Sequence, residues 1–113
     1  MFKVKFSLES VEKIDFFIEK YLKIFEKRFS DTWIFNEKII LEVYRQKSIE
    51  FKNEIYNSIE DVFWNSEILW YKSLENNKRR SWITIGNYNL FIEYFEDLEN
   101  KIRVIEKVEF HKK

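Results

Sequence analysis

The residues best suited to chemistry in this chain are a basic cluster, "KRR" at 78–80, and a single histidine, His111. An arginine fork holds phosphate oxygens through charge-assisted hydrogen bonds, and a histidine exchanges protons near neutral pH. Arg103 and Lys112 extend the basic patch if the C-terminal strand runs beside its neighbours. Two interpretations stay open: a solvated loop before a strand, or a surface that contacts phosphate or a partner protein.

The composition excludes several other kinds of active site. There is no cysteine, so thiolate nucleophiles, disulfides and cysteine-ligated zinc are ruled out. One histidine cannot supply a two-histidine metal site, and one glycine cannot build a glycine-rich phosphate loop. A site for a hard cation made of carboxylates alone stays open, but there is no Asp-rich loop, so we expect no metal and no organic cofactor. The formal net charge of zero also argues against a generally basic nucleic-acid binder.

The lone glycine, Gly86, stands in a chain that has no proline and no alanine, a bias typical of an AT-rich genome. Gly86-Asn87 separates two β-rich runs, "SWITI" (81–85) and "YNLFIEYF" (88–95), by two residues. A hairpin with a two-residue turn needs positive φ, which glycine adopts at little cost. We predict such a hairpin, with Gly86 at positive φ.

The first half of the chain reads as a strand followed by two long helices. "FKVKFS" (2–7) alternates apolar and basic residues, the period of a strand. Ser7 and Asn36 are expected to cap the two helices, and a bend is possible at "RQKS" (45–48). Large apolar residues at spacings of three and four should face the sheet: Val11, Ile14, Ile18, Tyr21, Phe25, Ile40, Ile55 and Ile59.

The last third reads as β-structure. "ILWY" (68–71) is a candidate short strand, and "KIRVIEKVEF" (101–110) follows the polar turn "EDLEN" (96–100). Most of the aromatic residues in this third are expected in the core, with even odds that Tyr88 and Tyr94 show a hydroxyl at the sheet surface.

The predicted architecture is one α+β domain over residues 1–113. It has an N-terminal strand, a long helical hairpin and a three- to four-stranded antiparallel meander, with the helices on one face. No apolar run is long enough to span a bilayer and the N-terminus has no signal-peptide pattern, so we expect a cytoplasmic protein.

The segment "KRRSWITIGNYNLFIEYFEDLENKIRVIEKVEFHKK" (78–113) resembles the C-terminal half of RelE/ParE-superfamily toxins. The matching pieces are Arg79-Arg80, Gly86-Asn87-Tyr88, Leu90-Phe91 and the strand from Ile102 to His111. The order strand, helix, helix, three-stranded meander is also that of the family. Departures are Asn89 where the family often has arginine, and His111-Lys112 with no tyrosine.

The resemblance implies a toxin of a type II toxin–antitoxin pair, with an antitoxin protein as partner. In one branch, a ribosome-dependent mRNA endoribonuclease, Arg79 or Arg80 would hold phosphate and His111 would act as acid or base. In the other branch the toxin binds DNA gyrase and needs no catalytic set. Tyr88, Arg103 and Lys112 complete the expected binding surface. An unrelated protein-interaction domain and a homodimer stay open.

Overall fold

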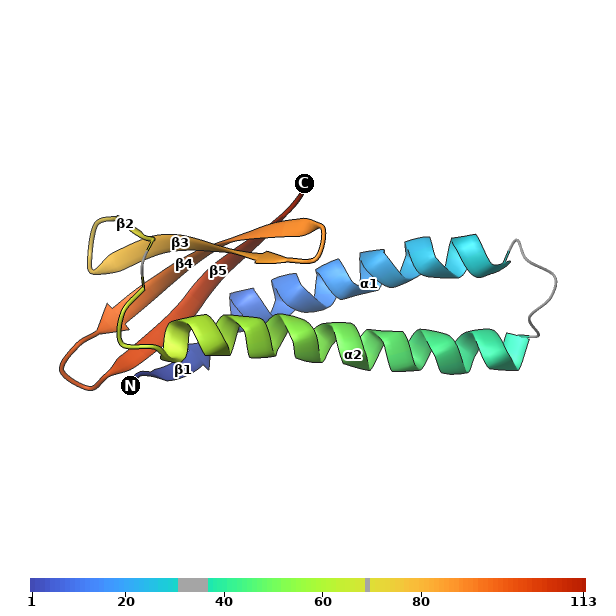
Figure 1. Cartoon of the computed structure of the whole chain (residues 1–113), viewed down its shortest axis with the longest axis horizontal. Coiled ribbons are helices and arrows are strands. Elements are labelled where there is room, and N and C mark those ends of the chain that lie inside the picture. The colour runs from blue at the N-terminus through green and yellow to red at the C-terminus, as the bar shows by residue number, and fades with distance from the viewer. Residues whose placement is uncertain (31–36, 69) are drawn as a thin grey trace.

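The computed structural model describes residues 1–30, 37–68 and 70–113, and within the helices the side chains of 24–30, 37–41 and 44 are not among those described. The elements are β1 (Lys3–Phe6), α1 (Leu8–Ser30), α2 (Glu37–Trp64), β2 (Lys72–Ser73), β3 (Lys78–Ile85), β4 (Tyr88–Asp97) and β5 (Ile102–Lys112). One sheet has the order β1-β5-β4-β3-β2 (Figure 1). The expected α+β class is confirmed, with the sheet mixed because β1 runs parallel to β5.

Ser7 joins the first strand to the first helix. Its hydroxyl oxygen accepts a hydrogen bond from the backbone N–H of Ser10 at 3.1 Å, so the predicted N-cap of α1 is confirmed. The same hydroxyl donates to the carbonyl oxygen of Glu106 on β5 at 2.9 Å. The cap therefore also fixes the start of α1 against the sheet.

The two helices pack on one side of the sheet through the predicted stripe. Ile14, Ile18, Ile55 and Ile59 are buried in the core, while Val11 and Tyr21 are half-buried. Phe25 and Ile40 lie outside the described side chains, and Asn36 lies outside the described residues. Helix α2 continues through residues 45–48, so the bend considered there is a local weakening of the apolar stripe and not a break.

The helical hairpin makes the molecule elongated. The principal extents are 56 × 24 × 22 Å and the radius of gyration is 16.7 Å, against about 13 Å for a compact domain of this length. Figure 1 shows why: the far parts of α1 and α2 extend well beyond the sheet. The sheet itself covers only the half of the hairpin that carries the N-terminus of α1 and the C-terminus of α2.

The two-residue turn between β3 and β4 has the predicted geometry. Ile85 pairs with Tyr88, and Gly86 has φ of +55°. A second tight turn, Asn76-Asn77, joins β2 to β3 with φ of 59° and 61°. The predicted strand at 68–71 is wrong for its described residues, because the short strand begins at Lys72.

Replacing Gly86 with valine should lower the free energy of unfolding by about 1 kcal/mol or more, since a β-branched residue is poorly tolerated at positive φ. Apart from its two chain neighbours, no atom in the described part of the chain lies within 4 Å of the position a Cβ would take at Gly86, so the loss comes from the backbone and not from a clash. Urea denaturation measures it. Gly86→Asn is the control and should lose less, because asparagine visits positive φ more readily. Equal losses for both variants would contradict the backbone explanation.

A β-bulge in β5 sets which side chains share a face. Glu93 pairs with Lys107 and the next residue, Tyr94, pairs with Ile105, so Glu106 has no partner across the strand. The inner face carries the core residues of β3, β4 and β5. The opposite face, called the outer face below, carries by alternation Arg80, Trp82, Thr84, Asn89, Phe91, Glu93, Phe95, Lys107, Glu109 and His111.

Candidate functional site

The structure brings only two of the six predicted site residues to the outer face. These are Arg80 on β3 and His111 on β5. Arg80 aligns across the sheet with Glu93 and then Lys107, whereas His111 lies four residues further along β5. With strands spaced 4.8 Å apart and a rise of 3.3 Å per residue, the two Cα atoms are about 16 Å apart. These two side chains cannot act on one phosphate group together in this arrangement.

His111 is exposed at the end of β5. Its Nε2 lies 3.3 Å from Oε2 of Glu109, and its ring meets the ring of Phe91 edge-on at 5.1 Å. Arg80 is exposed, and no ion pair involves it within the described part of the chain. Of the predicted site residues, the outer face thus carries one arginine and one histidine, and the two lie apart from each other.

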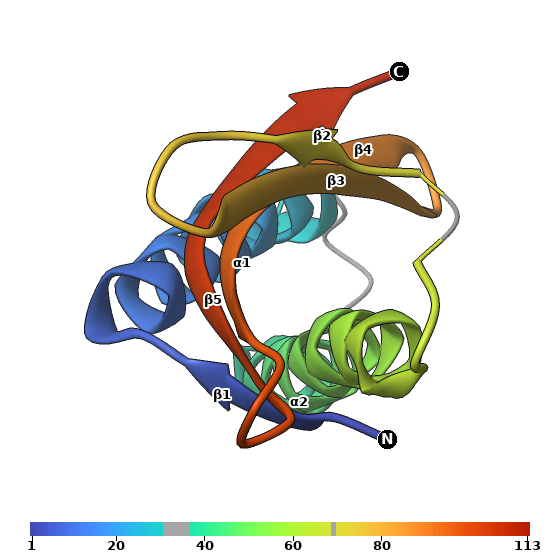
Figure 2. The same cartoon turned by 90° about the vertical axis from the view of Figure 1, so that its left-hand side faces the viewer.

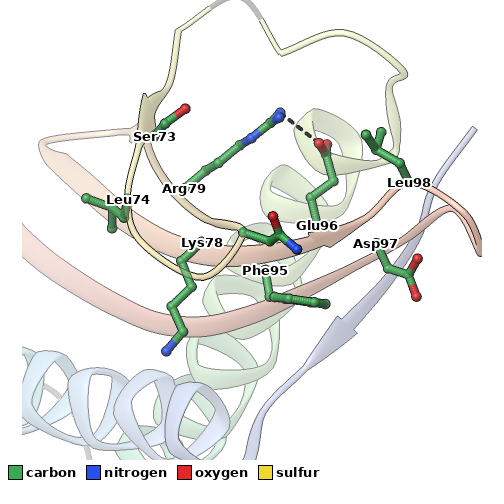
Figure 3. Close-up of a pocket in the computed structure, with 9 residues that line it drawn as sticks. Ser73, Leu74, Lys78, Arg79, Phe95, Glu96, Asp97 and Leu98 are labelled. Atoms are coloured by element: carbon green, nitrogen blue, oxygen red, sulfur yellow. Dashed lines mark ion pairs between the residues drawn. The ribbon is translucent and has the colours of Figure 1, made fainter.

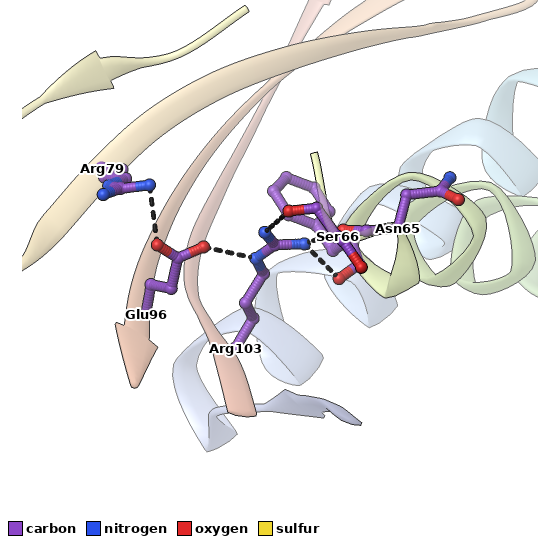
Figure 4. A network of polar contacts seen from close by, with 6 residues as sticks. Asn65, Ser66, Arg79, Glu96 and Arg103 are labelled. Carbon is purple, nitrogen blue, oxygen red and sulfur yellow. Dashed lines mark hydrogen bonds and ion pairs between the residues drawn. The ribbon is translucent and has the colours of Figure 1, made fainter. Parts of the chain in front are cut away.

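Arg103 is buried, which corrects the expectation that it belongs to an exposed binding surface. Its Nε donates to Oε1 of Glu96 at 2.8 Å, and its guanidinium lies 3.8 Å from the centre of the Phe2 ring. The remaining donors reach three carbonyl oxygens at the C-terminal end of α2, those of Phe63, Asn65 and Ser66 (Figure 4). Arg103 therefore caps α2 from the sheet, where a cation also complements the helix dipole.

Arg79 joins the same network from the other side of Glu96. Its Nη1 lies 2.7 Å from Oε2 of Glu96, and its guanidinium sits 4.5 Å from the centre of the Tyr71 ring. Figure 4 shows the Glu96 carboxylate between the two arginines. Because this places Arg79 on the inner side of the sheet, it is separated from Arg80 by the sheet itself.

Tyr88 and Lys112 lie at the turn end of the sheet, also away from the outer face. The Tyr88 ring packs edge-on against Phe17 of α1 at 4.9 Å and is half-buried. Lys112 pairs with Tyr88 across the strands and borders a hollow of about 470 Å³ between the helices and the Gly86 turn. The six predicted residues thus fall into three separate groups.

A pocket of about 340 Å³ adjoins the Arg79–Glu96 ion pair at the opposite end of the sheet (Figure 3). Lys78 and Asp97 border it, with the apolar side chains of Leu74, Phe95 and Leu98. Hydrogen bonds from Asn100 hold the pKa of the Asp97 carboxyl below its usual value. Each oxygen of the Glu96 carboxylate is held by one arginine, Oε2 by Arg79 and Oε1 by Arg103.

Tyr94 is the buried polar group without a partner next to this network. Its ring is fully buried against Phe63, and its hydroxyl has no hydrogen-bond partner among the described residues. The pKa of the Tyr94 hydroxyl is raised above 10.0; burial is the larger cause and the nearby Glu96 carboxylate the second. The sequence-based interpretation left its exposure open; the structure places it inside.

We expect Tyr94→Phe to leave the free energy of unfolding at pH 7 within about 1 kcal/mol of the wild-type value, because no hydrogen bond is lost. A phenol with a raised folded-state pKa stabilises the fold fully below the unfolded pKa, near 10.0, and this contribution is lost as the pH rises further. Urea denaturation between pH 7 and 11 should therefore show a shallower alkaline loss for Tyr94→Phe. Identical slopes for both proteins would contradict this account.

Several large aromatic side chains are exposed where the sequence predicts them in the core. The aromatic residues of the last third were expected mostly in the core, yet Trp70, Tyr71 and Trp82 are exposed, as is Trp64 at the end of α2. Phe91 and Phe95 are half-buried on the outer face. The alternation in "SWITI" contained the signal, since Ile83 and Ile85 on one face place Trp82 on the other.

Two further properties follow from the described residues. No group of three or more His, Asp or Glu side chains comes close enough to hold a metal ion in the described ranges. None of the described helices is both long and apolar enough to cross a membrane. No protein-family model, curated protein or solved structure matches this chain.

Proposed function

We propose that this chain is the toxin of a type II toxin–antitoxin pair, in the RelE/ParE manner, and that it acts by binding a protein target instead of cutting RNA. The order of its elements and the resemblance of residues 78–113 support the toxin assignment. The character of the outer face supports the mode of action.

The observation that carries the choice of a protein target is the pairing of charges on the outer face. Lys107 lies 3.9 Å from a carboxylate oxygen of Glu93. Glu109 places a carboxylate 3.3 Å from Nε2 of His111 and adds a negative charge to this face. At the rim, Lys78 reaches Glu106 at 3.0 Å, and this contact raises the pKa of the Lys78 ammonium. Basic side chains that already have carboxylate partners attract RNA phosphates weakly.

The same face has the composition of a protein-binding surface. Trp82 is 47% exposed, and Phe91, directly across the strands from it, is half-buried, as is Phe95 four residues further along β4. Aromatic residues and arginine are enriched among the residues that dominate binding energy at protein interfaces, within a rim of polar groups. Arg80 beside Trp82 fits that arrangement, and His111 lies too far from Arg80 for the two to act on one phosphate.

Expression of the wild-type chain in a bacterium tests the proposal. We expect growth arrest with intact mRNA, relieved by Arg80→Ala and by Trp82→Ala but not by His111→Ala. Asn57→Ala, at an exposed position of α2, is the matched surface control. Circular dichroism confirms that each variant is folded. DNA damage accompanying the arrest would identify gyrase as the target.

Two outcomes would contradict the proposal in different ways. Arrest with mRNA cut at codons, lost in both Arg80→Ala and His111→Ala, supports the endoribonuclease branch. No arrest, with no antitoxin gene beside this one, removes the toxin assignment and leaves an interaction domain. A neighbouring antitoxin gene is the least costly observation to make first.

A further inference from the structure

The edge of the sheet at β3 is only half covered. Strand β2 pairs with Arg79 and Arg80 alone, through Ser73 and Lys72. From Trp82 to Ile85, β3 has β4 on one side and no strand on the other within the described part of the chain. Figure 1 shows this part of β3 running past the end of β2 toward the Gly86 turn.

Within the described part of the chain, the backbone groups of this stretch of β3 form no ladder with a strand on the edge side, although the Trp70 carbonyl lies close by and accepts a hydrogen bond from the Ser81 hydroxyl at 2.5 Å. Because a two-residue turn closes β3 and β4 at Ile85 and Tyr88, alternate residues of β3 direct their N–H and C=O groups toward β4. The residues between them, Trp82 and Thr84, direct theirs to the free edge. Such unpaired rows are templates for another strand.

This edge lacks the features by which proteins usually protect an exposed strand. Those features are charged side chains, proline, a bulge or an extremely short strand. Residues 81–92, "SWITIGNYNLFI", form twelve consecutive residues without a charge in a chain that is 35% charged. Trp82, Ile83, Thr84 and Ile85, the residues of the free stretch, are all of types that favour strands. The free edge is therefore unprotected and suited to pairing with another strand.

We propose that Trp82–Ile85 of one chain pairs antiparallel with the same segment of a second copy, giving a two-fold dimer with one continuous sheet. An antiparallel pairing of identical edges is self-complementary, as a two-fold interface requires. With no charge in the segment, no like charges come to face each other, and the net charge of zero adds no long-range repulsion.

A second copy fits this edge better than a flexible peptide does. The free stretch is four residues long, so it offers few hydrogen bonds. A disordered peptide would lose about 1–2 kcal/mol of conformational entropy for every residue it orders there, whereas a preformed β3 edge loses little. Trp70 and Trp82 add apolar surface: they are 66% and 47% exposed, with ring centres 6.3 Å apart. Two copies would bring four such rings to one interface.

Sedimentation equilibrium of the purified full chain tests the dimer. Because the interface is small, we expect the mass to rise from 14.2 kDa toward twice that value as the concentration increases from about 5 μM to about 500 μM, as for a weak interface. Amide exchange of Trp82 and Thr84 should slow over the same range. A constant mass of 14.2 kDa would overturn the proposal.

Matched variants locate the interface. Thr84→Lys places two like charges at the two-fold edge and should abolish the concentration dependence. Thr84→Ser keeps the hydroxyl that bonds to Asn89, so this variant should retain the concentration dependence of the mass. Asn57→Lys adds the same charge at an exposed position of α2, and this variant should also retain the concentration dependence. A dimer that survives Thr84→Lys, or one disrupted equally by Asn57→Lys, would place the interface elsewhere.

Discussion

Replacing Arg103 with leucine should lower the free energy of unfolding by about 3–5 kcal/mol, the loss typical of removing one partner from a buried ion pair. The side chain is 2% exposed and satisfies Glu96 together with the end carbonyls of α2. Leucine leaves the Glu96 carboxylate with Arg79 alone, and it leaves the helix carbonyls without donors. Urea denaturation at pH 7 measures the change.

Three comparisons make this result specific. Arg80→Leu changes the same residue type at an exposed position and should stay within about 0.5 kcal/mol of the wild type. Arg103→Lys keeps the charge but cannot form the same set of bonds, so its loss should be intermediate. The double variant Arg103→Leu with Glu96→Leu should recover part of the loss. A small effect of Arg103→Leu would mean that the network contributes little net stability.

The burial of Arg103 in its hydrogen-bond network could not be predicted from the sequence. "KIRVIEKVEF" predicted a strand, and the alternation of Ile and Val was sufficient to place it in the sheet. The sequence predicts Arg103 as an extension of the exposed basic patch, because the C-terminal strand runs beside its neighbours. Its burial depends on the end of α2, about 40 residues earlier in the chain. No local pattern contains that contact.

The faces of the sheet show a second limit of the same kind. The Gly86 turn fixed the register of β3 against β4, because a two-residue turn permits few pairings. The bulge at Glu106 reverses the alternation along β5, and nothing in the local sequence marks it. Before the bulge Arg103 faces inward, and after it His111 faces outward. Without the bulge, the two residues would share one face.

The helices were the most predictable part because their apolar stripe is long. In α1, a 3.6-residue period sustained over a helix of 23 residues outweighs any single ambiguous position. The cap at Ser7 marks the start of α1. Periodicity does not predict how far the hairpin extends past the sheet, because that distance depends on the width of the sheet and not on the helix sequence.

Truncating Phe63 to alanine should lower the free energy of unfolding by about 3–5 kcal/mol, as for other fully buried phenylalanines. Phe63 has no exposed surface, and its ring packs edge-on against Tyr94 at 4.7 Å between α2 and the sheet. Its backbone carbonyl still accepts from Arg103 in the variant, so the helix cap is kept. The loss therefore reports the packing of α2 on the sheet.

The adjacent residue supplies the matched control. Trp64 is an aromatic residue at the same end of α2, but it is 50% exposed, so Trp64→Ala should cost about 1 kcal/mol or less. Both changes remove an aromatic ring from the last turn and alter helix propensity similarly. Chemical denaturation of the two variants separates packing from propensity. Equal losses would mean that α2 is held by its own helical stability and by Arg103, with little contribution from the ring of Phe63.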